Sequence, residues 1–169
     1  MFCRRNYSCC SCGGYPYPTI TRESGLVGPT GPTGPTGPAI SSVYATVVNT
    51  EDATAVSTTA LTFNSTLVNN GLTIGENSIT VPTAGAYLVS FQIGKGANAV
   101  ANDNVGVAIN GDIDDVTEIP VTSASTNSKT VVLKLNASDA ITLVPTLTSN
   151  LTISSTPGTS VTLTVAKIS

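Results

Sequence analysis

The sequence contains no histidine and no tryptophan, and charged residues make up only 10% of it. Histidine is the commonest general base and the commonest metal ligand, so its absence leaves few residues for catalysis. A Ser-His-Asp relay is impossible for the same reason. A serine-lysine pair is the alternative, but no recognisable catalytic motif contains Lys95, Lys129, Lys134 or Lys167. We therefore expect no enzymatic activity and no cofactor.

The low charge also narrows the range of partners. Seven basic and ten acidic residues give a net charge of −3, with no basic patch that could neutralise a phosphate backbone. Nucleic acid is therefore not an expected partner. Residues 1–18 contain no apolar run long enough for the core of a signal peptide, and we expect neither an export signal nor a membrane span.

Composition divides the chain into three parts. Residues 1–24 are a cysteine-rich segment with a joint, residues 25–39 carry glycine at every third position, and residues 40–169 are rich in Thr, Val, Ile, Ser and Asn. A chain of 169 residues with 40% hydrophobic content can bury one core of ordinary size. We expect one globular domain, called the head below, with appendages.

All four cysteines lie in the first part, at Cys3, Cys9, Cys10 and Cys12. Zinc sites usually show paired C-x2-C spacing or histidines, and neither occurs here. Adjacent Cys9 and Cys10 do not easily bridge each other, which favours disulfides to other chains and a role in anchoring. A metal site and a reduced tail are the alternatives.

The glycine triplets are the most specific pattern in the chain. Three polyproline II strands can wind around one axis only where every third residue is glycine. Prolines follow most of these glycines and pre-set the backbone. The pattern predicts a collagen-like stalk of roughly 45 Å at about 3.1 Å per residue, with a proline-rich linker that never assembles as the alternative. The triplet glycines are Gly25, Gly28, Gly31, Gly34 and Gly37.

So short a triple helix should not be stable alone, because ordering each chain costs backbone entropy and few interchain bonds offset that cost. The domain that follows is the obvious candidate for holding three chains together. We therefore predict that residues 40–169 form a homotrimer.

The pattern of residues 40–169 predicts β structure, because apolar residues alternate along short runs bounded by turn residues. Asn110-Gly111 predicts a tight hairpin. About ten strands and no helix are expected, which favours an all-β sandwich or jelly roll. Expected inward residues are Tyr87, Val89, Phe91, Ile93, Val105, Val107, Ile109, Val131, Leu133, Leu135, Val161, Leu163 and Val165. Further strands are expected near 41–48, 60–63, 71–74, 77–81, 115–121, 139–145 and 149–154.

Carboxylates are concentrated around the expected hairpin. Asp112, Asp114 and Asp115, with Asp103 nearby in sequence, could supply oxygen ligands for calcium. No calcium-loop motif accompanies them, and solvated turn carboxylates are the commoner case. We expect no metal site.

Several strings taken together resemble the BclA-like collagen-like glycoproteins of the bacterial spore surface. These are "FNSTLVNNGLTI", "ITVPTAGAYLVSFQIG", "VAINGD", "VVLKLNASDAITLV" and "LTVAKIS", placed after the Gly-Pro-Thr triplets. The resemblance covers roughly residues 25–169 and implies a trimeric jelly roll of the complement and tumour necrosis factor type after an O-glycosylated stalk. It makes Thr30, Thr33 and Thr36 glycosylation candidates. Residues 1–18 do not match the family's proline-rich, cysteine-free leader.

Two functions fit these features. The first is a structural protein of the spore surface, in the exosporium or an appendage, made in the mother-cell cytoplasm and tethered to an outer-layer protein through the cysteines. The second is a trimeric receptor-binding or adhesive fibre tip, such as a phage tail fibre or an adhesin, for which a host surface or glycan would be the partner.

Overall fold

The computed structural model describes residues 31, 42–156 and 158–169. Residues from 42 onward belong to a compact unit, Ala39–Ser169, whose described residues form strands and one 3₁₀ turn, η1 (Asp115–Thr117). No helix in this part of the chain is long and apolar enough to cross a membrane. The strands are β1 (Tyr44–Asn49), β2 (Ala53–Ala55), β3 (Ser65–Asn70), β4 (Thr73–Ile74), β5 (Ile79–Thr80), β6 (Gly85–Ile93), β7 (Gly96–Ala97), β8 (Asn104–Ile109), β9 (Asp112–Ile113), β10 (Ile119–Pro120), β11 (Asn127–Leu135), β12 (Ala140–Thr146), β13 (Leu151–Ile153) and β14 (Val161–Lys167).

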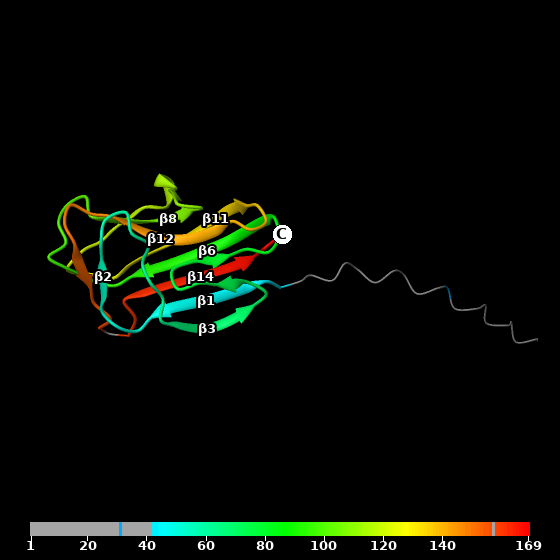
Figure 1. The fold of residues 1–169 in the computed structure, drawn as a ribbon, viewed down its shortest axis with the longest axis horizontal. Helices are drawn as coiled ribbons and strands as arrows, with labels where there is room; N and C mark the ends of the chain where they lie inside the picture. The colour runs from blue at the N-terminus through cyan, green and yellow to red at the C-terminus, as the bar shows by residue number, and fades with distance from the viewer. Residues whose placement is uncertain (1–30, 32–41, 157) are drawn as a thin grey trace, which may run out of the picture. The chain divides into compact units, whose positions relative to one another are not determined.

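Two antiparallel sheets make up the β-sandwich (Figure 1). The first has five strands in the order β11-β6-β14-β1-β3, and the second follows the path β10-β8-β12-β5-β4, with β9 paired to β8. A small third sheet, β2-β13-β7, is also present. This arrangement matches the jelly-roll fold predicted from the sequence, although the strands outnumber the ten or so expected.

The predicted inward faces of the long central strands are confirmed. Tyr87, Val89, Phe91 and Ile93 of β6 are all buried, and so are alternate residues of β14 beside it. Such alternation follows from the two-residue period of a strand with one face on the core. The Tyr87 hydroxyl donates to the backbone oxygen of Thr83 at 2.7 Å, so this buried ring brings no unsatisfied polar atom into the core.

The predicted hairpin at Asn110-Gly111 is also confirmed. Both residues have positive φ, at 54° and 95°, and the turn pairs β8 with β9. This is the geometry that the two-residue turn requires, and asparagine followed by glycine adopts it at low cost.

Two predicted strands are wrong in detail. Residues 60–63 form no strand: the Leu61 amide donates to the backbone oxygen of Leu143 and the Phe63 amide to that of Glu76, and both side chains are buried although the segment joins no ladder. The predicted strand 115–121 is interrupted because the Asp114 side chain accepts a hydrogen bond from the Val116 amide and starts η1. Only Ile119–Pro120 of that range is a strand.

Candidate assembly surface

The outward face of the five-stranded sheet carries an apolar row that crosses four strands. Val132 of β11 lies opposite Leu88 of β6, Leu88 opposite Ala166 of β14, and Ala166 opposite Tyr44 of β1. Directly opposed residues of antiparallel strands point to the same face with side chains in contact range. We call these four residues the apolar row.

The apolar row is accessible in the single chain. Val132 is 58% exposed and Tyr44 is 38% exposed, while Leu88 and Ala166 are half-buried. Isolated exposed apolar residues are ordinary on protein surfaces, but a contiguous apolar patch marks a site where another surface packs. The row is therefore a candidate interface.

A second row runs parallel to the first and consists of hydroxyl side chains. Thr130, Ser90, Thr164 and Thr46 are paired across the same four strands. Ser90 and Thr130 hydroxyl oxygens lie 2.9 Å apart, and those of Thr46 and Thr164 lie 3.0 Å apart. Because each hydroxyl has a partner within this hydroxyl row, covering it with a protein surface leaves fewer polar groups unsatisfied.

Neither row contains a charged residue. Charges are depleted at the centres of protein interfaces because they are expensive to desolvate. The apolar row also lies where β1 begins, since Tyr44 is the first residue of that strand. Tyr44 is thus the member of the apolar row that follows the predicted stalk segment most closely in sequence.

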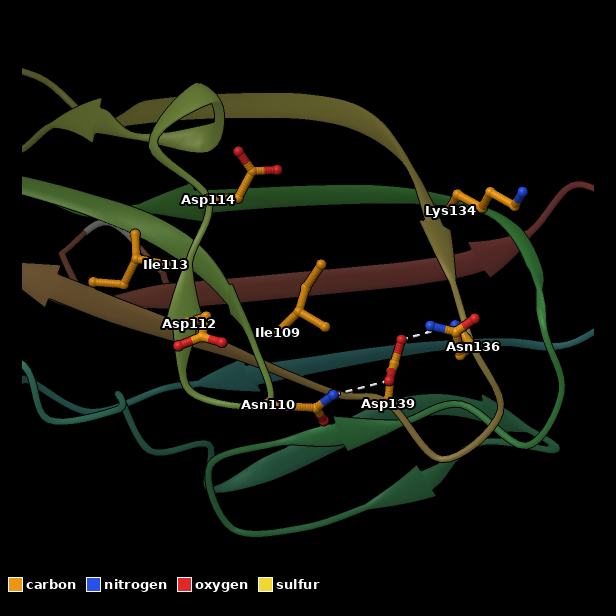
Figure 2. A pocket seen from close by; sticks show the side chains of 8 residues that line it. All are labelled: Ile109, Asn110, Asp112, Ile113, Asp114, Lys134, Asn136 and Asp139. Atoms are coloured by element: carbon orange, nitrogen blue, oxygen red, sulfur yellow. Dashed lines mark hydrogen bonds between the residues drawn. The ribbon is translucent and has the colours of Figure 1, made fainter.

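A separate polar hollow of about 420 Å³ lies between the β8–β9 hairpin and the end of β11 (Figure 2). Ile109 is among the side chains that line it, and Asp112 and Lys134 come from opposite sides of it (Figure 2). Other side chains around it are Asn110, Ile113, Asp114, Asn136 and Asp139.

Asp139, a carboxylate that lines the hollow, stabilises the turns around it through hydrogen bonds. Asp139 accepts hydrogen bonds from the Asn136 amide at 2.7 Å and from Asn110 Nδ2 at 2.8 Å. The first of these bonds, and then the second, lower the pKa of Asp139 because both favour the charged form. Asp139 thus fastens the β11–β12 turn to the hairpin.

The four carboxylates considered as calcium ligands do not come together. Asp112 and Asp114 line the hollow, and Asp115 does not. Asp103 is buried, where it accepts bonds from the amides of Thr148 and Val100 and from the Thr148 hydroxyl, each at 2.9 Å. The backbone bond from Thr148, followed by that from Val100, lowers the pKa of Asp103. Across residues 42–156 and 158–169, no three acidic or thiol side chains are grouped to hold a metal ion.

Most of the sequence-predicted site residues lie outside the described residues. This applies to all four cysteines, to Thr30, Thr33 and Thr36, and to the triplet glycines other than Gly31. Gly31 is exposed, with no described atom within 4 Å of the place a Cβ would occupy. The stalk, the sugars and the anchor therefore stay predictions.

The four lysines form no serine pair in the described part of the chain. The Lys129 ammonium donates to the backbone oxygens of Val116 and Glu118, and the Lys167 ammonium donates to Thr83 Oγ1 at 3.0 Å. Neither Lys95 nor Lys134 is hydrogen-bonded through its ammonium to a described serine.

No protein-family model matches the sequence, and no curated protein matches it. Among solved structures, the chain resembles murine APRIL at pH 8.0 with a TM-score of 0.53 and 15% identity, covering 75% of this chain and 99% of that one. Murine APRIL at pH 5.0 gives a TM-score of 0.51 and 17% identity over the same shares. These likenesses show the fold, which is a jelly roll of the tumour necrosis factor type, as the resemblance implied.

Proposed function

We propose that the chain is a homotrimeric, non-catalytic structural protein of the spore surface, in which the head holds three chains together and the collagen-like segment connects it to the layer beneath. The observation that carries this proposal is the pair of uncharged rows on the five-stranded sheet. They offer a surface that a second and a third copy can cover.

Three copies are favoured over two because of the glycine triplets. A collagen helix needs three polyproline II strands, and five consecutive triplets supply the glycine at each axial position. The head must then provide most of the association free energy, because the triplets are too few to do so. Closing the apolar row would bring together the three copies of Tyr44, which follows the stalk segment by a few residues in the sequence.

Outside the head, we assign anchoring to the cysteines and glycosylation to the threonines of the triplets. Twelve thiols in a trimer, four from each chain, would lie within a short segment at one end of the stalk. Arg4 and Arg5 stand between Cys3 and Cys9, and their positive charge favours the thiolate form that attacks a disulfide. Thr30, Thr33 and Thr36 would point outward from the rod, where their hydroxyls could carry sugar.

Light scattering tests the trimer directly. The full chain under reducing conditions and a head fragment of residues 40–169 should both give the mass of three chains at micromolar concentration. A monomer mass for the head fragment would contradict the proposal. Immunogold labelling of intact spores tests the location separately. Spores without label on their surface would favour the receptor-binding fibre.

A further inference from the structure

The sequence contains two Asn-Gly dipeptides, Asn70-Gly71 and Asn110-Gly111. In such a dipeptide the glycine nitrogen can attack the asparagine side-chain amide, because glycine has no Cβ to obstruct the approach. Both asparagines are exposed, so access to water does not distinguish them. Their hydrogen bonds do.

Asn110 is held at both ends of its side-chain amide. Its Nδ2 donates to Asp139 at 2.8 Å, and its Oδ1 accepts from the Ala140 amide at 2.9 Å. Its own backbone amide donates to Ala140 at 2.9 Å. For the side chain to turn toward the nitrogen of Gly111, it must break both side-chain bonds, one of them to a carboxylate.

The Asn70 side chain makes one hydrogen bond to the described residues, against two for Asn110. Its Nδ2 donates to the backbone oxygen of Ser42, and its Oδ1 accepts no hydrogen bond from any described residue. It is the last residue of β3, which is an edge strand, and Gly71 follows with a φ of 81°. Asn69 fastens the backbone of the turn through two side-chain bonds to Leu72, but the bond to Ser42 is the one hydrogen bond to a described residue that the Asn70 side chain itself must break in order to rotate.

We infer that Asn70 is a site of spontaneous deamidation in the folded protein and that Asn110 is protected from the same reaction. The Gly71 nitrogen gives its proton to hydroxide and forms a bond to Cγ of Asn70; Nδ2 takes a proton from water, and the bond from Cγ to Nδ2 breaks with release of ammonia. Water then opens the resulting five-membered imide at one of its two carbonyls. The products are aspartate and isoaspartate, and no oxidant, reductant or enzyme takes part.

The product changes the start of the head. A carboxylate cannot donate the hydrogen bond that Asn70 gives to Ser42, and its negative charge faces a carbonyl oxygen instead. Asn70 is also paired with Tyr44, so the change lies at the end of the apolar row. An isoaspartate additionally inserts a carbon into the backbone of β3, which disturbs its pairing with β1.

Peptide mapping by mass spectrometry tests this inference on the full chain incubated in mildly alkaline buffer. Asn70 should convert at least about tenfold faster than Asn110, which corresponds to about 1.4 kcal/mol of extra barrier at Asn110. In denaturant the two rates should become similar. Equal rates in the folded protein, or an Asn70 that stays intact while the denatured chain reacts, would overturn the inference.

An Asp139→Ala variant provides the matched control, because it removes the acceptor of Asn110 and leaves Asn70 untouched. The Asn110 rate should rise toward the Asn70 rate in this variant, with circular dichroism confirming that the head is folded. A folded variant in which Asn110 stays as slow as before would show that the hydrogen bond is not the protecting feature and would refute the explanation. Asn70→Asp should reproduce the product and increase hydrogen exchange in β1 and β3.

Discussion

A lysine in the apolar row should separate association of the head from its folding. Val132 is 58% exposed in the single chain, so Val132→Lys should change the free energy of unfolding of a monomer by about 0.5 kcal/mol or less. In the proposed trimer the same position is covered. The lysine variant no longer gains from covering the part of the valine side chain that is exposed in the single chain, which costs about 1 kcal/mol in each protomer.

The ammonium adds to this cost because it must be desolvated or must reach the rim of the interface. A total of about 2 kcal/mol in each protomer is about 6 kcal/mol in a trimer, which weakens association about 10⁴-fold. Sedimentation velocity across a concentration series measures this shift directly. Circular dichroism of the same samples reports whether the fold is unchanged.

Val100→Lys is the matched control, since Val100 is 53% exposed and lies between β7 and β8, away from both rows. It should leave the trimer unaffected. If Val132→Lys remains trimeric at the concentrations where the unsubstituted head is trimeric, then the apolar row is not the interface. Equal weakening by the two lysines would likewise refute the argument, because it would point to a general charge effect.

Thr117→Val should destabilise the head by about 2 kcal/mol in urea denaturation, because the buried amide of Val107 loses its acceptor at 2.7 Å; an unchanged midpoint would contradict this. Hydrogen bonds lower the pKa values of Asp52, Asp103 and Asp139, so their stabilisation is present above the unfolded pKa of about 3.9 and is lost as the pH falls through the folded values. With no histidine in the chain, the thermal midpoint should be nearly constant between about pH 5 and 8 and should fall below about pH 4; a steep change near pH 6.5 would contradict it. Gly31→Ala should remove the triple-helix signal in circular dichroism while the head stays trimeric. Changing all four cysteines to serine should make the protein extractable from spores by denaturant without reductant, and unchanged retention would refute a covalent anchor.

The inward faces of the central strands could be predicted because local and tertiary preferences agree there. Along β6 every second residue is large and apolar, and both neighbours in the sheet are long strands that complete its hydrogen bonding. The same two-residue period in β11 predicts burial less accurately. Leu135 is buried, whereas Val131 and Leu133 are only half-buried, because β11 is at the edge of its sheet. Position within a sheet cannot be obtained from the period of one strand.

The strands that sequence reasoning missed lack the pattern on which it depends. All six residues of β3 are exposed, so no alternation marks it as a strand. Residues 60–63 show the reverse case, in which Leu61 and Phe63 are buried although their segment pairs with no ladder. Burial and strand pairing are separate properties, and the hydrophobic pattern reports only the first.

The apolar row could not be predicted from the sequence, because its residues are brought together by the register of four strands. The sequence already placed Leu88 and Val132 opposite the inward residues of their own strands, but their proximity depends on register across β11, β6, β14 and β1. Tyr44 and Ala166 join them from opposite ends of the head sequence. None of the four belongs to the buried core, which is closed by residues on the other face of the same strands. The core therefore needs no partner to be complete, and substitutions in the row can test association while the fold stays intact.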